Sequence, residues 1–302
     1  MKQSLGNGLR LAFQTIRSHK LRAFLTVLGV IVGTGTIIGV GAILTGFDKT
    51  ITSILSSFGS NSIIVFKFDV GVRFGELTPE ERSRKNLTYV NAVHIKERSK
   101  SVREVSPMLF PNRGFINASY KGNETYDVDI FGVEEAYAQA GQADLREGRF
   151  FTDDENRRRA PVVVIGENIE KGLFAHVDPI GKTIKVDGHE FEIVGTMKRP
   201  AASFFGDQDN RVLVPYWVMQ KMYPNARENA IVVTAYDGKL ADALDEVRMV
   251  LRMDRRVPYN KPDDFALSTA EQMIGNFRQI MAITFAVMVA LSSMGQIGRA
   301  HV

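Results

Sequence analysis

The sequence contains no cysteine, which excludes disulfide bonds and cysteine metal sites. Its five histidines do not stand at the spacing of a metal site, and His189-Glu190 lacks the second histidine of a zinc-protease helix. Neither a Gly-x-x-x-x-Gly-Lys-Ser/Thr phosphate loop nor a Gly-x-Ser-x-Gly nucleophile motif occurs. We therefore expect no catalytic residues, no metal and no bound cofactor. An enzymatic role is the weakest interpretation of this chain.

Residues 23–47 lack charge altogether, although 24% of all residues are charged. A membrane's hydrocarbon core takes about 20 apolar residues of helix to cross, so this run predicts a transmembrane helix. A cleaved signal peptide is one alternative, but its apolar region would span only ~7–15 residues and end at a small-x-small site. A buried helix of a soluble protein is the other. The six glycines of the run argue against it, because glycine is costly in such a helix.

The charges on either side of this run predict its orientation. Arg17, Lys20 and Arg22 precede it and Asp48 follows it. Because cytoplasmic flanks of membrane helices collect Lys and Arg, residues 1–22 should stay in the cytoplasm. The formal net charge of +4 is mild, and much of the basic excess lies in this leader. It therefore indicates membrane topology and not nucleic-acid binding.

The leader is expected to lie on the membrane surface as an amphipathic helix. Leu5, Leu9, Phe13 and Ile16 stand at helical spacing and would contact lipid. An alternative is that the leader simply extends the transmembrane helix.

Glycines inside the apolar run predict a packing surface. Gly29 and Gly33, and likewise Gly35 and Gly39, are four residues apart, as in the small-x-x-x-small pattern that lets membrane helices approach closely. We expect them to contact a neighbouring transmembrane helix, in this chain or in another.

Beyond residue 48 the chain predicts a large folded domain of strands and helices. Thr88 can cap a helix expected over residues 89–100, and a helix expected over residues 239–253 carries an apolar stripe. The expected strands cover residues 62–68, 102–109, 126–133, 161–165, 182–186, 189–194, 211–214 and 230–235. The expected helices cover residues 89–100, 166–174, 215–222 and 239–253.

Three local signals refine this prediction. Asp187-Gly188 between two strands predicts a tight hairpin, Pro107 is expected to break the second strand, and the charged residues 153–159 read as a solvated loop. A polar loop after Pro200 carries the aromatic pair Phe204-Phe205. This pair could contact a substrate or a partner protein, or it could tuck into the domain.

The end of the sequence predicts a return to the membrane. Ser268-x-x-Glu271 has the form of a capping box and should open a final helix. That helix enters an apolar run from Ile280 to Met294, so we expect residues 276–295 to begin a second transmembrane helix.

A series of short motifs runs along nearly the whole chain. They are Arg17-Ser-His-Lys-Leu-Arg22 before Leu25–Gly33, Phe58–Val65, Val105-Ser-Pro107, Gly148–Asp153, Ala160–Glu167, Asp178–Ile184, Val186-Asp-Gly188 and Phe191–Gly195. No single motif is diagnostic, but their order and spacing resemble the permeases of MacB-type ABC transporters, which combine a MacB-like periplasmic core domain with an FtsX-like permease.

The resemblance implies an α+β fold in the bacterial inner membrane. A porter-like part (residues 48–136 and 229–270) would be interrupted by a small α/β-rich part (residues 137–228), together forming a periplasmic core over residues 48–275. It also implies a second permease protomer in a homodimer and an ABC ATPase that supplies ATP hydrolysis. A periplasmic adaptor and an outer-membrane channel are further partners of this family. The implied role is mechanical coupling that exports a drug, a peptide or a lipoprotein.

The family pattern also predicts what this sequence omits. Helices three and four and the segment that contacts the ATPase are missing. Residues 296–302 resemble a translated sequencing adapter, so we expect a truncated permease whose natural sequence departs near Gly295. Two alternatives stay open: an FtsX-like transmembrane relay, and a membrane-anchored binding or sensor domain without transport.

Overall fold

The computed structural model forms two compact units. One comprises Met1–Lys49 and Phe277–Val302, and the other comprises Thr50–Asn276. The residues it describes are 61–68, 78–111, 114, 116–175, 177–198 and 210–297, with scattered positions between 20 and 46. The leader residues Leu5, Leu9, Phe13 and Ile16, and the topology residues Arg17 and Arg22, lie outside the described residues. Lys20 is described as helical and exposed.

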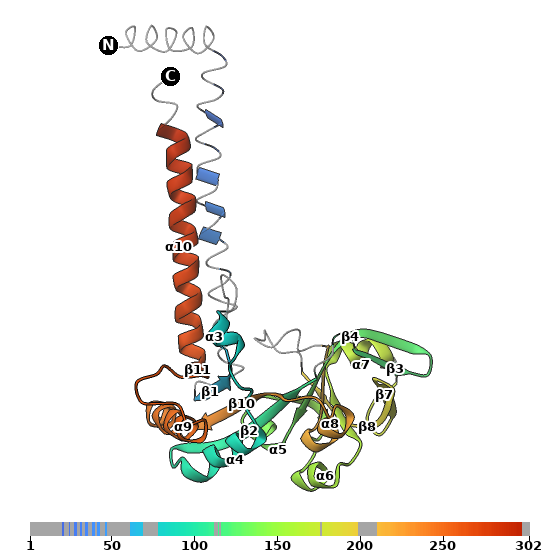
Figure 1. Cartoon of the computed structure of the whole chain (residues 1–302). Coiled ribbons are helices and arrows are strands. Elements are labelled where there is room, and N and C mark those ends of the chain that lie inside the picture. Colours follow the sequence, from blue (N-terminus) through green and yellow to red (C-terminus); the bar gives the residue numbers. More distant parts are fainter. Residues whose placement is uncertain are drawn as a thin grey trace, which may run out of the picture. The chain divides into compact units, whose positions relative to one another are not determined.

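The Thr50–Asn276 unit is built on one continuous network of paired strands (Figure 1). The network begins with four strands in the order β11-β1-β10-β2 and continues through β4. The strands are β1 (Ser62–Phe66), β2 (Val102–Phe110), β3 (Ile116–Tyr120), β4 (Asn123–Val133), β5 (Leu145–Gly148), β6 (Val162–Ile165), β7 (Thr183–Val186), β8 (His189–Met197), β9 (Arg211–Pro215), β10 (Glu228–Ala235) and β11 (Ala266–Thr269).

From β4 onward the pairings close into a ring. β4 pairs with β3, β3 with β7, β7 with β8, β8 with β6, β6 with β9, and β9 returns to β4. A closed ring leaves no free strand edge within it. β3 and β4, which we placed in the porter-like part, thus pair with strands of the predicted inserted part. Where the two parts divide stays a prediction.

Helices cover the sheet on several sides. α4 and α9 lie against each other and over β1, β10 and β2, where their apolar side chains share one buried cluster (Figure 1). The helices are α3 (Pro79–Arg82), α4 (Tyr89–Arg98), α5 (Glu135–Gln139), α6 (Asp153–Arg158), α7 (Glu167–Phe174), α8 (Tyr216–Met222), α9 (Leu240–Asp254) and α10 (Ala270–Ile297).

A buried apolar cluster joins the four-stranded part to the ring. Met108 of β2 and Val232 of β10 share it with Phe131 of β4, Val164 of β6 and Leu213 of β9. The two parts of the sheet therefore share a core and do not merely adjoin.

The predicted mixed α+β fold and several of its local signals are confirmed. The Thr88 hydroxyl accepts a hydrogen bond from the amide of Asn91 and caps α4. Asp187 and Gly188 join β7 and β8 with φ of 47° and 79°, the positive values that a tight hairpin turn requires. The apolar run of β6 is buried at every position.

Three predictions are wrong, each for a local reason. Residues 153–159 hold helix α6 and not a loop, because Thr152 and Glu155 form a capping box that we overlooked. β2 runs through Pro107 without a break. Proline is tolerated there because β2 pairs with β10 along one edge but with a second strand, β4, only at Leu109. The capping box of α10 is formed by Thr269 and Gln272. The predicted pair of Ser268 and Glu271 lies one residue too early.

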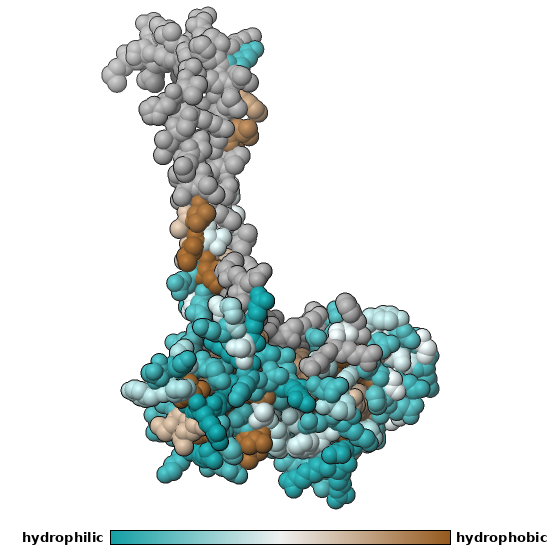
Figure 2. Space-filling model, in the orientation of Figure 1, coloured by the Kyte–Doolittle hydropathy of each residue, from teal (hydrophilic) through white to brown (hydrophobic). Residues whose placement is uncertain are grey.

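Among the residues that the structure describes, no helix combines the length and the apolar character needed to cross a membrane. The crossings at residues 23–47 and 276–295 stay predictions. On the face shown in Figure 2, the Thr50–Asn276 unit is mostly hydrophilic, with small apolar patches.

Two glycines with the same backbone conformation allow a matched test of packing. Gly148 has φ of 77° and Gly141 has φ of 75°. A Cβ atom at Gly148 would lie 2.4 Å from the Val194 carbonyl oxygen, whereas at Gly141 it would meet nothing within 4 Å. We expect Gly141→Ala to lower the free energy of unfolding by about 1 kcal/mol and Gly148→Ala by about 3 kcal/mol. Urea unfolding followed by the fluorescence of Trp217 measures both, and equal losses would contradict this packing.

The cap of α6 predicts a dependence on pH. Hydrogen bonds from the Arg149 guanidinium, 2.7 Å from each Glu155 oxygen, lower the pKa of Glu155 to about 2. A carboxyl whose folded pKa is depressed stabilises the fold above its unfolded pKa of about 4.3, and this contribution is lost as pH falls toward the folded value. We expect Arg149→Met to cost about 1 kcal/mol at pH 7 and much less near pH 2.5. Arg157→Met, an exposed control in α6, should change unfolding little at either pH.

Candidate functional site

Two neighbouring strands carry both chain connections at one end of the domain. β1 pairs with β11 antiparallel, with Ile63 opposite Thr269 and Phe66 opposite Ala266. Because the strands are antiparallel, the chain that enters β1 at Ser62 and the helix that leaves β11 at Ala270 lie at the same end of the pair. Any movement applied to either connection therefore reaches the same two strands.

The other edge of β1 is held by β10. The two strands pair from Ser62 opposite Thr234 to Val65 opposite Ile231. At the end where the chain enters, the Asn61 side-chain amide donates to Asp237 at 2.7 Å and the Ala235 amide donates to the Asn61 carbonyl at 2.9 Å. The entry point is thereby fixed to the centre of the sheet.

An arginine near the end of α9 holds the loop that leads to β11. The Arg252 guanidinium forms an ion pair with Asp263 and donates to the carbonyls of Pro258, at 2.8 Å, and Lys261, at 3.2 Å. One side chain thus closes the loop onto the helix that precedes it.

A second arginine ties the same loop to a distant segment. Arg255 is 5% exposed and lies 2.7 Å from Asp264. It also donates to the carbonyls of Lys85, at 2.7 Å, and Asn86, at 3.3 Å. Buried guanidinium groups need such partners to offset the cost of desolvation. The segment that connects α9 to β11 and α10 is therefore held in place by side-chain contacts.

Helices α4 and α9 are joined by a buried carboxylate. Asp254, the last residue of α9, accepts hydrogen bonds from Asn91, His94 and Arg98 of α4, with distances of 3.3, 2.7 and 3.2 Å. A carboxylate at a helix C-terminus is repelled by the helix dipole, so these donors compensate for an unfavourable position. The two helices that cover β1 thus move as one layer.

A further polar contact joins α4 to the ring. Glu134 accepts hydrogen bonds from the Tyr89 hydroxyl at 2.9 Å and from the Asn156 amide at 3.2 Å. Burial raises the pKa of the Glu134 carboxyl above its usual value. Asn156 also accepts from the backbone amide of Trp217 at 3.2 Å, so one cluster connects α4, α6 and α8.

The structure describes only part of the predicted packing surface. Gly29, Gly33, Phe204 and Phe205 lie outside the described residues. Gly35 and Gly39 are helical, and an added Cβ at either would meet no atom of the described part of the chain within 4 Å. Their predicted role in helix packing stays a prediction.

The contacts of Arg252 and Arg255 were not among the predictions from the sequence, although a signal for them exists. Basic residues three positions apart end an amphipathic helix, and the acidic pair Asp263-Asp264 follows after a short loop. Such a pattern indicates that the loop folds back onto the helix.

A comparison with known families decides where this domain belongs. The model of the MacB-like periplasmic core domain matches residues 23–248. The chain belongs to this family. The match covers most of the chain, including strands β1 to β10.

Curated relatives agree with this assignment. The macrolide export ATP-binding/permease protein MacB of Bdellovibrio bacteriovorus is 29% identical over 290 residues, which cover 94% of this chain and 44% of the relative. The protein of the same name from Neisseria meningitidis is 30% identical over 288 residues, covering 94% of this chain and 42% of the relative. The MacB-like chain therefore spans less than half the length of these relatives.

Solved structures show the same fold. The periplasmic region of MacB from Actinobacillus actinomycetemcomitans aligns with a TM-score of 0.60 at 20% identity, over 76% of this chain and 97% of that one. The extracellular domain of the ABC-type transporter YknZ from Gram-positive bacteria aligns with a TM-score of 0.52 at 19% identity, over 69% and 100%. The MacB-like domain here thus has the α+β fold of a periplasmic or extracellular transporter domain.

Among the described residues, no group of three or more His, Asp or Glu side chains could hold a metal ion. The expectation that the MacB-like chain binds no metal or cofactor stays a prediction.

The arginine contacts predict unequal losses from substitutions of Arg248, within α9, and of Arg255, its C-cap residue. We expect Arg255→Met to lower the free energy of unfolding by about 3 kcal/mol, because it leaves Asp264 and two carbonyls without their donor. Arg248→Met is the matched control, since Arg248 is 45% exposed and its pairs with Asp245 and Asp263 span 3.3 and 3.4 Å. It should cost less than about 1 kcal/mol. Urea unfolding followed by Trp217 fluorescence compares the two, and similar losses would show that the Arg255 contacts contribute little.

Proposed function

We propose that this chain acts as a permease component of an ABC transporter of the MacB type. It would pass movement, driven by ATP hydrolysis in a partner ATPase, to the domain formed by Thr50–Asn276. That movement would export a substrate from outside the cytoplasm. The chain itself would make or break no bond in the substrate.

The pairing of β1 with β11 is the observation that carries this proposal. Two connections that leave a sheet on adjacent, hydrogen-bonded strands cannot shift independently without breaking the pairing. Arg252 and Arg255 hold the loop that leads to β11, and so restrict the connection through α10. Force on the connections would therefore displace the whole β11-β1-β10-β2 sheet and the α4–α9 layer upon it.

Family membership supports the rest of the proposal. The names of the relatives describe macrolide export with an ATP-binding part, so we propose an ATPase partner and a drug, peptide or lipoprotein as cargo. The chain would work as a homodimer in the bacterial inner membrane, in contact with lipid, with its N-terminus in the cytoplasm. A periplasmic adaptor and an outer-membrane channel would complete the export path.

A glycine substitution tests both transport and the predicted packing surface. We expect Gly39→Leu to lower ATP-driven export at least about fivefold while ATP hydrolysis continues, because the larger side chain would keep a neighbouring helix away. No atom of the described residues lies within 4 Å of a Cβ at residue 39, and this position lies outside the Thr50–Asn276 unit, so that unit should stay folded. Inverted membrane vesicles containing the protein and its ATPase, supplied with a radiolabelled macrolide and a labelled lipopeptide, give the measurement.

Gly41→Leu is the matched control for this experiment. It makes the same change two residues further along the helix, on a different face, and its Cβ would likewise meet no atom within 4 Å among the residues that the structure describes. Export that falls equally in both variants would argue against a specific packing face. ATP hydrolysis without movement of either cargo would favour a transmembrane relay, and an absence of any response to ATP would contradict the permease proposal.

A further inference from the structure

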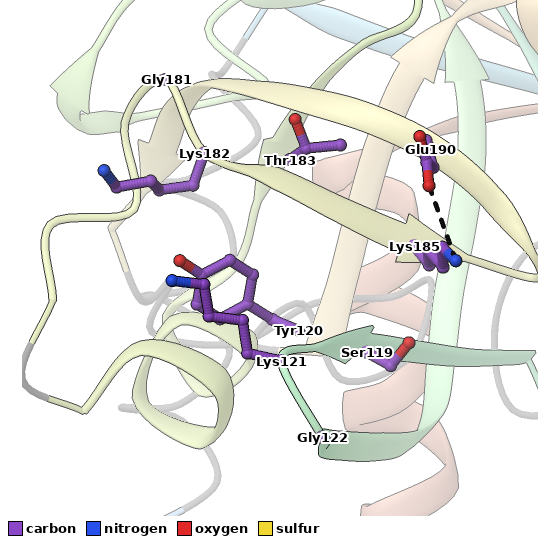
Figure 3. A pocket seen from close by; sticks show the side chains of 9 residues that line it. All are labelled: Ser119, Tyr120, Lys121, Gly122, Gly181, Lys182, Thr183, Lys185 and Glu190. Atoms are coloured by element: carbon purple, nitrogen blue, oxygen red, sulfur yellow. Dashed lines mark ion pairs between the residues drawn. The ribbon is translucent and has the colours of Figure 1, made fainter.

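An open pocket lies on the outer surface of the ring, on the side where the β3–β4 turn faces strand β7 (Figure 3). Its volume of about 700 Å³ falls within the ~300–1,000 Å³ that small-molecule sites occupy. Its lining comes from two segments of the chain and is polar and basic. The lining residues are Ser119, Tyr120, Lys121, Gly122, Gly181, Lys182, Thr183, Lys185 and Glu190.

The pocket carries an excess of positive charge. Three lysines and one glutamate line it, which leaves two positive charges in excess. Lys185 and Glu190 lie 3.5 Å apart and partly neutralise each other. Lys121 and Lys182 form no ion pair with any acidic side chain that the structure describes. Like charges that share a pocket repel one another, and a bound anion would relieve this repulsion.

Hydroxyl groups accompany the two lysines that lack an acidic partner. In Figure 3 the ammonium groups of Lys121 and Lys182 and the hydroxyl of Tyr120 lie at the same end of the pocket. Ser119 and Thr183 supply two further hydroxyls. Ammonium and hydroxyl groups are the donors that an anionic oxygen accepts from, and Lys binds phosphate as a point charge.

The walls of the pocket are held in place before any ligand arrives. β3 pairs with β7, with Ser119 opposite Lys185, and this pairing spans the floor. Lys121 and Gly122 form the turn with φ of 46° and 91°, and Gly181 has φ of 74°. The Tyr120 ring lies 4.3 Å from the ring of Phe174, centroid to centroid, which fixes its orientation. A preformed site loses little entropy when it binds.

From these features we infer that the pocket binds an organic phosphate. The phosphate group would lie between Lys121 and Lys182 and accept a hydrogen bond from the Tyr120 hydroxyl, which lies on the same side of the pocket (Figure 3). A cavity of about 700 Å³ is much larger than one phosphate group, so the ligand carries an organic part beside the Tyr120 ring. The inference concerns the ring alone and stands whether or not the chain takes part in transport.

Calorimetric titration of the purified full chain, in detergent, tests this inference. The probes are glycerol 3-phosphate, with glycerol as its uncharged counterpart, and detergent micelles that contain phosphatidylglycerol. We expect binding of a phosphate probe that weakens as salt is added, and no binding of glycerol. The double variant Lys121→Gln/Lys182→Gln should bind at least about tenfold more weakly, the equivalent of one charge-assisted hydrogen bond.

The double variant Lys85→Gln/Lys100→Gln is the matched control, because it removes the same charge from exposed positions outside the pocket. It should keep the affinity of the native chain within about twofold, and equal thermal unfolding of all three proteins would show that each is folded. Lysine-dependent binding of free glycerol 3-phosphate indicates a soluble ligand, and such binding of the micelles alone indicates a lipid headgroup. The inference is overturned if neither probe binds, or if both double variants lose the same affinity.

Discussion

The antiparallel pairing of β1 with β11 joins strands from opposite ends of the domain sequence, and the rest of the structure is arranged around it. One strand receives the chain from the residues before Asn61, and the other passes it on to α10. The ladder between them, together with the pairing of β1 to β10, makes the two connections parts of one sheet. A domain whose two connections lay on strands that are not paired with each other could flex between them, whereas this domain cannot do so without breaking the hydrogen bonds between β1 and β11.

Charged side chains around this pair act over short distances and are mostly satisfied. Arg252 and Arg255 close the loop before β11, and Asp254 joins α9 to α4. Each of these three side chains forms hydrogen bonds to several protein groups in place of water. Removing one of them would therefore leave several buried donors or acceptors without a partner. This arrangement makes the loop between α9 and β11, and the contact between α4 and α9, rigid parts of the domain, as the proposed coupling role would require. The basic pocket in the ring is different, since two of its lysines face solvent without an acidic neighbour in the described part of the chain.

The shared core explains why the ring and the four-stranded part form a single compact unit. Phe131 and Leu213 from the ring pack with Met108 and Val232 from β2 and β10. β4 contributes to both parts, because it pairs with β2 at Gly132 and with β9 from Asp129 to Val133. Relative movement of the two parts would have to disturb this cluster. We infer that the ring follows the sheet when the sheet is displaced.

Much of the local structure could be predicted from the sequence, because it depends on neighbouring residues alone. Thr88 caps its helix, Asp187-Gly188 turns its hairpin and the apolar run of β6 is buried, since a cap, a turn and a hydrophobic run are each local. The overlooked Thr152-x-x-Glu155 box was equally local. Pairing partners were not predictable, because β1 with β11, and β4 with β9, depend on contacts between distant segments. Most helices and strands could therefore be predicted from neighbouring residues, although helix α6 and the exact cap of α10 were not. Which strands meet, and where the arginines and lysines gather, depends on the folded chain, because long-range packing and hydrogen bonding select among many pairings that the same local elements allow.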